Sequence, residues 1–213
     1  MSTTKRLNLY SKFERFNHWV QAGLIITLIL TGFEMHGTWS LFGFEKSFTI
    51  HNWCAWAWLT LFIFDAFYLM VTGEWRQFQP TFRKLRDVIR YYLVGIFRGE
   101  PHPVPKSERA KHNPLQRLAY LSIVMILVPF QMITGFLYYY YNDWAAIGLG
   151  GVELSTMALL HTIGAFGILA FIIVHVYMTT TGHTIFSHLG AMITGYEEVE
   201  DHGQETKEQA PSS

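Results

Sequence analysis

The sequence has very little cysteine and little charge. Cys54 is the only cysteine among 213 residues, which excludes an intrachain disulfide framework, a cysteine-held iron–sulfur cluster and covalent haem attachment through Cys-x-x-Cys-His. Charged residues make up 15% of the chain, against about 25% in ordinary soluble domains. Lys and Arg balance Asp and Glu at 16 each, so net charge gives no support to a nucleic-acid partner or an acidic substrate.

Half of the residues are apolar, and they gather into long runs. This pattern excludes a disordered chain or a coiled coil and favours a membrane protein over a water-soluble domain. Four of the runs approach the roughly 20 helical residues that a bilayer demands. The sequence therefore predicts an all-α membrane protein, with a domain of residues 1–196 built on a four-helix transmembrane bundle. We expect its helices at residues 16–33, 51–72, 118–137 and 154–180.

Glycine occurs at or just beyond the end of each predicted span, where it is typical of a helix C-cap. The four positions are Gly32, Gly73, Gly135 and Gly182. The segments Leu30-Thr31-Gly32-Phe33 and Ile133-Thr134-Gly135-Phe136 resemble each other, although four residues are weak evidence for an internal repeat.

Positive charge lies almost wholly on one side of the predicted spans. Four Lys or Arg precede residue 18, ten lie in 73–117 and one follows residue 180, whereas the two opposite connections hold only Lys46. The positive-inside rule then makes both termini cytoplasmic and the protein a multi-pass component of the bacterial cytoplasmic (inner) membrane.

Two further helices are expected on the cytoplasmic surface. Apolar residues at helical spacing among arginines predict a basic amphipathic helix at about residues 81–97, and a shorter one follows the fourth span near residues 185–193. The Glu-rich residues 197–213 are expected to form a disordered tail.

Four of the ten histidines fall inside the apolar segments, where ionisable groups are costly. His18 lies near the cytoplasmic start of the first span, and His51 begins the second span on the outer side. On the fourth span His161 and His175 are 14 residues apart, so they share one helix face with ~21 Å of rise between them. His161 therefore matches the depth of His51, and His175 matches that of His18.

Two depth-matched histidine pairs on different helices are what two bis-histidine haem groups require. A single membrane histidine is more often a hydrogen-bonded contact between helices, but two matched pairs favour iron ligation. We expect His51 and His161 to bind the outer iron, and His18 and His175 the inner one. Without a Cys-x-x-Cys-His motif both groups are haem b, held by ligation and packing.

Small and basic residues near these histidines fit the same interpretation. Gly164 and Gly167 on the fourth span, with Gly23 on the first, remove side chains where a flat macrocycle would press on the backbone, although small residues also serve plain helix packing. Arg15, one turn before His18, is a candidate partner for the inner haem propionates and equally a positive-inside anchor.

Asp65 is the other ionisable group within the spans, 14 residues after His51 and thus on the same helix face toward the cytoplasm. One interpretation is a proton relay at a quinone pocket beside the inner haem. The alternative is an ion pair with an arginine of residues 73–117. The remaining histidines, His36 and His183 among them, fall in loops or at helix ends, where solvated or interfacial roles are expected.

The chain resembles the membrane cytochrome b subunits of formate dehydrogenase, nickel–iron hydrogenase and thiosulfate reductase. The resemblance covers all four spans and is most specific at Arg15-Phe16-Asn17-His18-Trp19, at His51 and at His161-x13-His175. The segment from Thr179 to Glu198 is most similar to the thiosulfate reductase-type branch. The resemblance implies the same two haem ligand pairs and a menaquinone or ubiquinone site near the inner haem.

The resemblance also implies which residues line that quinone site. The formate dehydrogenase branch uses Lys-x-Asn-x-x-Gln at the start of the third span, and here the stretch reads Lys111-His112-Asn113-Pro114-Leu115-Gln116. Asn113 is thus the leading quinone contact and Gln116 a weaker one, while Pro114 departs from the pattern. The competing interpretation is that Asn113-Pro114 simply caps the helix, since Asn suits the N-cap and Pro the first helical position.

These observations predict a dihaem electron carrier between the quinone pool and an outer-face partner in a respiratory oxidoreductase complex. The outer loops carry no nucleotide or cluster motif, so substrate chemistry is expected on another subunit, reached through an iron–sulfur or c-type cytochrome subunit. Two alternatives stay open. One is a self-sufficient cytochrome b561-like quinone oxidoreductase with a diffusible outer donor, and the other is a proton-linked transporter that uses histidine and Asp65 as a relay.

Overall fold

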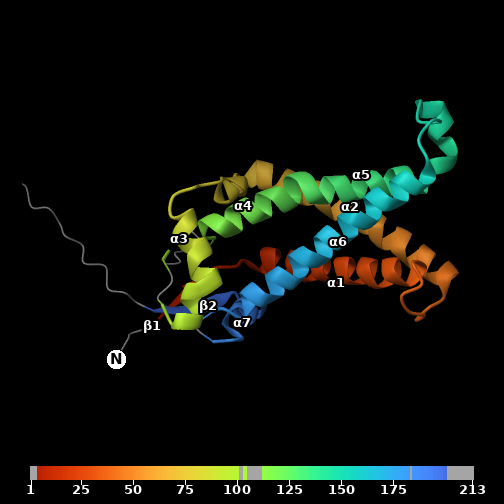
Figure 1. Ribbon diagram of the computed structural model, residues 1–213. Helices are drawn as coiled ribbons and strands as arrows, with labels where there is room; N and C mark the ends of the chain where they lie inside the picture. The colour runs from red at the N-terminus through yellow and green to blue at the C-terminus, as the bar shows by residue number, and fades with distance from the viewer. Residues whose placement is uncertain (1–3, 101–102, 105–111, 183, 201–213) are drawn as a thin grey trace, which may run out of the picture.

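The structure is a computed structural model that describes residues 4–100, 103–104, 112–182 and 184–200. Four long helical spans lie along a common direction and cross one another at moderate angles (Figure 1). The strands at the two described ends of the chain, β1 and β2, lie together at one end of the bundle (Figure 1). The four spans therefore alternate in direction, as the sequence predicts.

Each span is long and apolar enough to cross a membrane. The first is α1 (Lys12–Met35), the second α2 (Phe44–Thr72) and the fourth α6 (Leu154–Thr179). The third runs from Pro114 to Tyr139 and consists of α4 (Pro114–Ser122), a π-helical turn η4 (Ile123–Leu127) and α5 (Val128–Tyr139). The all-α class with four transmembrane helices is confirmed, and three of the spans begin several residues before the predicted positions.

The π-helical turn in the third span has a local cause. Pro129 is the second residue of α5, and a proline inside a helix has no N–H to donate and its ring clashes with the carbonyl four residues earlier. Widening the preceding turn relieves that clash and lets one continuous span include the proline.

Helix ends follow the expected chemistry at some positions and not at others. Ser11 forms a capping box with Glu14 at the start of α1, and Gly73 ends α2 in the left-handed conformation, as predicted. Gly32 and Gly135 are not caps, because α1 and α5 continue past them to Met35 and Tyr139. Gly182 is not a cap either, because α6 ends at Thr179 and Thr180 is its C-cap residue.

A small buried centre joins three spans. Trp58 of α2, Val128 of α5 and Ile168 of α6 pack together, while many other large apolar side chains of the spans are exposed. In a membrane those side chains meet lipid instead of water, so their exposure carries no penalty.

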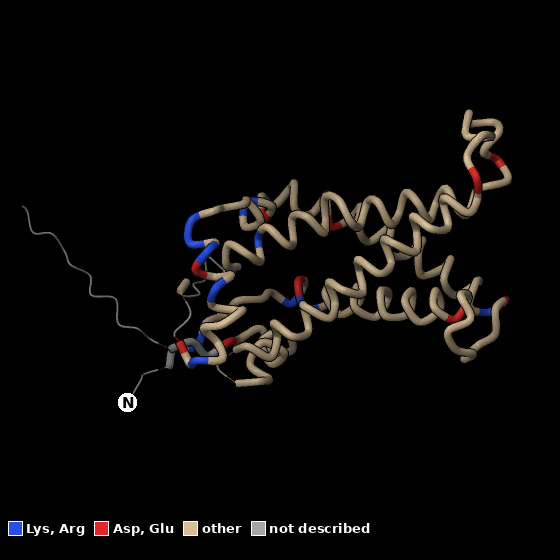
Figure 2. The backbone as a smooth tube through the Cα atoms, in the orientation of Figure 1, with Lys and Arg blue, Asp and Glu red and all other residues tan. Residues whose placement is uncertain are grey.

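Charge is distributed as the sequence predicts. Lys and Arg gather at the end of the bundle where β1 and β2 lie, and the opposite end is almost free of them (Figure 2). Positive charge marks the cytoplasmic side, which places β1 and β2 there and the connection between α1 and α2 outside.

The predicted amphipathic helix at 81–97 is shorter and less regular than expected. The chain forms η1 (Glu74–Phe78), α3 (Leu85–Arg90), a π-helical turn η2 (Tyr91–Gly95) and η3 (Ile96–Arg98). Lys84, at the N-cap of α3, has a left-handed backbone with φ of 60°, so no helix continues through it from residue 81. Val88 of α3 is fully buried, which anchors the segment to the bundle.

The predicted disordered tail is wrong at its beginning. β2 (Tyr196–Glu200) pairs antiparallel with β1 (Thr4–Asn8), and α7 (Ser187–Thr194), the predicted short helix, precedes β2. The sequence prediction failed here because the pairing joins opposite ends of the chain, and no local pattern reveals such a partner. Residues 201–213 of the predicted tail lie outside the described residues.

The outer loop between α1 and α2 is organised around a buried acid. Glu34 accepts hydrogen bonds from the backbone N–H groups of Leu41, Phe42 and Gly43, each at 2.7 Å, and from the Ser47 hydroxyl at 2.6 Å. The Glu34 carboxylate therefore accepts hydrogen bonds from the N–H groups just before α2, and these bonds hold the loop against the start of that helix.

Candidate functional site

Two pairs of histidines face each other at two levels of the bundle. At the outer level His51 of α2 faces His161 of α6, with ring centres 6.4 Å apart. At the inner level His18 of α1 faces His175 of α6, with ring centres 6.1 Å apart. Each side chain comes from a different turn or helix, so only the folded bundle brings the members of a pair together.

These separations suit a metal ion between the rings. A metal–imidazole bond is about 2.0–2.1 Å long and the ring centre lies roughly 1.1 Å behind the bonding nitrogen, so two imidazoles on opposite sides of one ion have centres about 6.3 Å apart. Two rings in direct contact can have their centres anywhere from about 4.5 to 7 Å apart. Both observed distances agree with axial ligation from two sides.

Hydrogen bonds define which nitrogen of each outer histidine is free to bind. The hydroxyl oxygen of Thr31 lies 2.9 Å from Nδ1 of His51, and that of Thr134 lies 3.2 Å from Nδ1 of His161. Each hydroxyl donates its one hydrogen to a backbone carbonyl of its own helix, so it accepts from the ring. Nδ1 therefore carries the proton in both rings and Nε2 keeps its lone pair. In His161 this lone pair already accepts a hydrogen bond from the Gln131 amide at 3.1 Å.

A cavity of about 550 Å³ lies at the outer level, lined by His51, His161 and mostly apolar side chains. Gly32 and Gly135 also line it, and each lies against one of the two histidine rings. A mostly apolar lining and two facing imidazoles fit haem b at this level, where iron would replace the hydrogen bond that Nε2 of His161 accepts from Gln131.

The inner pair has a different environment. The ring of Phe171 stacks on His175 with centres 5.7 Å apart, and Trp19 lies edge-on to His18. Nδ1 of His18 is buried and has no hydrogen-bond partner among the described residues. The geometry of the rings fits haem here too, but the ligands lack the threonine contacts of the outer level.

Residues 9–195 match the protein family described as prokaryotic cytochrome b561. The chain belongs to that family. The family implies haem b and electron transfer in a membrane, in agreement with the opposed histidines. As a member of the prokaryotic cytochrome b561 family with four spans, the protein is a multi-pass inner-membrane cytochrome.

One curated relative is the protein of Escherichia coli (strain K12) named "Putative cytochrome YdhU". It is 31% identical to this cytochrome over 202 residues, which cover 90% of the present chain and 75% of the relative. No solved structure matches the chain.

Three of the predicted haem contacts have other partners in the structure. The Arg15 guanidinium donates to the backbone carbonyls of Ser11 and Ile193, so it fastens α1 to the end of α7, and its role at a haem propionate stays a prediction. A side chain at Gly164 would overlap Gln131 and Phe130, and one at Gly167 would meet Leu127 at 3.0 Å.

Gly164 and Gly167 therefore let α6 approach α5 and do not face a macrocycle. Gly23, the third glycine of that prediction, has open space around its missing side chain. The glycines that do touch the ligand rings, Gly32 and Gly135, are the ones that the sequence pattern assigned to helix caps.

Asp65 forms no ion pair with any arginine that the structure describes. Its two carboxylate oxygens accept hydrogen bonds from the Asn17 amide at 2.9 Å and from the Gln21 amide at 2.8 Å. Both amides belong to α1, and no arginine contacts Asp65 in the part of the chain that the structure describes. Asp65 is therefore hydrogen-bonded to Asn17, the residue next to the predicted ligand His18.

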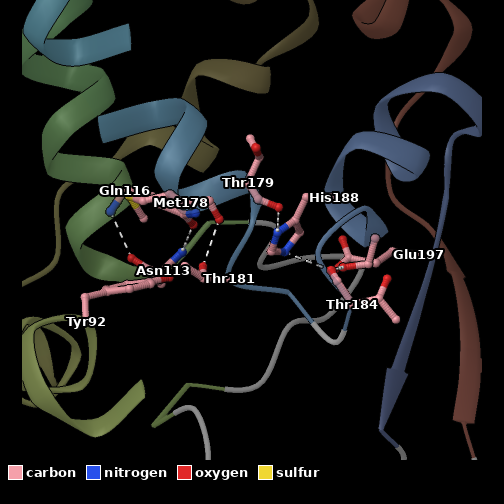
Figure 3. Close-up of polar contacts among 10 residues, drawn as sticks. Tyr92, Asn113, Gln116, Met178, Thr179, Thr181, Thr184, His188 and Glu197 are labelled. Carbon is pink, nitrogen blue, oxygen red and sulfur yellow. Dashed lines mark hydrogen bonds and ion pairs between the residues drawn. The ribbon is translucent and has the colours of Figure 1, made fainter. Parts of the chain in front are cut away.

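Asn113 and Gln116 form a capping box at the start of the third span (Figure 3). The Asn113 amide also donates to the hydroxyl of Tyr92 at 3.0 Å, and Tyr92 is hydrogen-bonded to Thr181 beyond the end of α6. Burial raises the pKa of Tyr92 to about 12 despite the opposing hydrogen bond from Asn113. The capping interpretation is therefore correct as far as local structure goes, and Lys111 lies outside the described residues.

His188 ties the cytoplasmic elements together beside this cluster (Figure 3). Its Nδ1 lies 3.2 Å from the carbonyl of Thr179, at the end of α6, and its Nε2 lies 3.3 Å from the carboxylate of Glu197 in β2. His36 lies at the outer end, where it contacts Thr162 of α6 at 3.5 Å. His183 lies outside the described residues.

Residue patterns alone did not identify Thr31, Thr134 and Gln131 as neighbours of the outer ligands. Threonine within a helix usually bonds its own backbone, so a threonine gives no signal by itself. The similar segments around Thr31 and Thr134 were the available clue.

Proposed function

We propose that this cytochrome holds two haem b groups and carries electrons across the inner membrane between quinone near the cytoplasmic face and a redox partner on the outer face. The observation that carries the proposal is the pair of opposed histidine rings at each of two levels, at 6.4 and 6.1 Å. Haem bound at each level supplies one-electron chemistry that amino-acid side chains lack.

The chain's own residues hold and insulate these two positions. His51, His161, His18 and His175 would hold the two haem irons, and a mostly apolar lining surrounds the outer position. His161 and His175 lie on one face of α6 with ~21 Å of rise between them. An electron therefore crosses the membrane in shorter transfers, through the two haem positions, instead of in one long transfer.

The quinone site is proposed at the start of the third span. Neighbouring rings connect this region to the inner level: His112 to Tyr120 at 5.1 Å, Tyr120 to Phe171 at 6.4 Å and Phe171 to His175 at 5.7 Å between centres. The Asn113 side-chain amide can donate a hydrogen bond to a quinone carbonyl. Gln116 lies beside Asn113, to which it is hydrogen-bonded.

Asp65 is the proposed proton-carrying group of this site. A quinone gains or loses protons with its electrons, so it needs an acid or base near the inner haem. Asp65 is bonded to Asn17, next to the ligand His18. The quinone is menaquinone or ubiquinone.

On the outer face, the proposed partner is an iron–sulfur or c-type cytochrome subunit that connects to a catalytic subunit. This part of the proposal depends on the resemblance to the thiosulfate reductase-type branch. The second candidate is a self-sufficient quinone oxidoreductase with a diffusible donor, which membership of the b561 family favours. Extraction in mild detergent separates them: a bound outer-face subunit supports the first, and quinol oxidation by the isolated chain supports the second.

Ligand substitutions test the haem assignment. We expect His161→Ala and His175→Ala each to lose one haem of two, the first from the outer level and the second from the inner level. His188→Ala is the control, because His188 contacts Thr179 and Glu197 at the cytoplasmic end and belongs to neither pair. Haem content per protein and low-spin electron paramagnetic resonance (EPR) signals give the answer. A protein that keeps both haems after either ligand substitution would refute the ligand pairs.

A further inference from the structure

Two threonine–glycine dipeptides occupy equivalent places beside the outer histidines. Thr31-Gly32 of α1 lies against His51 of the next helix, and Thr134-Gly135 of α5 lies against His161 of the next helix. The similar segments that contain them are thus a structural repeat, with one copy for each outer ligand.

The hydroxyl groups have the same bonding pattern in both copies. Thr31 donates its hydrogen to the carbonyl of Thr27 at 2.7 Å, and Thr134 donates its hydrogen to the carbonyl of Phe130 at 2.8 Å. A hydroxyl has one hydrogen to give, so each oxygen can only accept from the Nδ1–H of its histidine. Both threonines are buried, with 0% and 4% of their surface exposed, which shields these bonds from water.

Backbone carbonyls one turn earlier complete the repeat. His51 forms a backbone hydrogen bond with Leu28, and His161 forms one with Gln131. Leu28 and Gln131 each precede their threonine by three residues, and each threonine also bonds that carbonyl. In both copies, therefore, the carbonyl three residues before the threonine interacts with the threonine and with its histidine.

We infer that the hydroxyls of Thr31 and Thr134 are positioning groups that fix the tautomer and ring orientation of the outer haem ligands and lower the reduction potential of the outer haem. The inference rests on the proposed ligation by His51 and His161. A hydrogen bond accepted from Nδ1–H makes the imidazole a stronger electron donor at Nε2, which favours ferric iron. His18 has no such partner at Nδ1, so the effect belongs to one level.

The test replaces each hydroxyl by a methyl group of the same shape. Thr31→Val, Thr134→Val and the double variant of the full-length protein are titrated electrochemically while the haem α-band is followed, and their low-spin EPR g values are recorded. We expect one of the two midpoint potentials to rise and the corresponding g values to shift, most in the double variant. The other potential should not change.

Two controls separate positioning from general damage to the helices. Thr27→Val removes a hydroxyl that bonds only the Gly23 carbonyl, and it should leave both potentials as in the wild type. Thr31→Ser and Thr134→Ser restore the hydroxyl and should restore the potential. Loss of the outer haem in a valine variant, with retention in the serine variant, also supports the inference.

Valine variants whose potentials and g values match those of Thr27→Val would overturn the inference, as would serine variants that behave like valine. Failure of the ligand proposal has a different signature, because wild-type protein would then lack bis-histidine low-spin haem altogether.

Discussion

Gly32→Ala and Gly135→Ala each add one methyl group beside an outer histidine, but we expect them to have unequal effects on haem binding. A Cβ at Gly135 would lie 2.8 Å from Cε1 and 3.3 Å from Nδ1 of His161, whereas a Cβ at Gly32 would lie 3.5 Å from Cε1 of His51. The second distance is ordinary van der Waals contact. The first is 0.7 Å shorter, so the His161 ring must move in Gly135→Ala.

That movement has an energetic scale. Inserting a methyl group into a packed site costs about 1–3 kcal/mol, and each 1.4 kcal/mol is about tenfold in an equilibrium constant. The His161 ring cannot rotate freely, because Thr134 bonds its Nδ1 and the proposed iron would hold its Nε2. We therefore expect Gly135→Ala to weaken haem binding at the outer level by about 10- to 100-fold, and Gly32→Ala to change it by less than about threefold.

Haem transfer measures the difference directly. Each purified variant is mixed with an excess of a haem-binding acceptor protein, and the decay of its own absorption gives the dissociation rates of the two haems. Both substitutions gain the same helix propensity from Gly to Ala, at most about 1 kcal/mol, so this contribution cancels between them. Equal rates in the two variants, or faster loss from Gly32→Ala, would refute the reasoning.

Three further substitutions test other parts of the structure. Glu34→Gln should lower the thermal unfolding midpoint and expose the loop at 36–43 to protease more than Ser47→Ala does, because it disturbs three backbone N–H bonds instead of one hydroxyl bond. Asn113→Asp keeps the helix cap but removes the amide donor, so quinol-driven haem reduction should slow several-fold while the spectrum and thermal midpoint are kept; an unchanged rate removes Asn113 from the quinone site. Asp65→Asn should slow the same reaction at unchanged haem content, whereas Gln21→Leu, which keeps the carboxyl group, should slow it less.

The spans could be predicted from the sequence because a bilayer imposes a length on every crossing segment. Helix geometry also fixes depth: 14 residues between His161 and His175 place them on one face, and the positions of His51 and His18 follow from the same counting. The structure brings these residues together in the predicted pairs. Depth matching succeeds since it needs only the start of each span and the rise per residue.

Glycine positions were misinterpreted for a physical reason. A glycine near the end of an apolar run suits a helix cap but equally suits close approach of another helix, and composition cannot distinguish the two. Gly32 and Gly135 accommodate histidine rings, while Gly164 accommodates the Gln131 side chain. Such assignments depend on which side chain faces the glycine across the bundle, and that follows only from the assembled fold.

Long-range contacts at the cytoplasmic end were equally hidden. Arg15 lies one turn from His18, which suggested a propionate partner, yet its guanidinium bonds the carbonyl of Ile193 near the other end of the chain. Trp19 donates to the carbonyl of Met192 beside it. These two bonds hold the start of α1 against the end of α7. The same contacts therefore help to position both the sheet of β1 and β2, which follows α7, and His18, which lies between Arg15 and Trp19.

The two levels of the bundle differ in a way that suits different tasks. At the outer level a buried threonine bonds each of the two proposed ligand rings, and a site that only passes electrons benefits from ligands that do not reorganise. At the inner level the nearby polar groups are amides, a carboxylate and a phenol that bond one another, as Asp65 does with Asn17 and Asn113 with Tyr92. Groups of this kind can exchange partners when a quinone takes up or releases protons. From these contacts we propose that the outer level keeps its hydrogen bonds fixed during electron transfer, whereas the inner level exchanges hydrogen bonds as protons move.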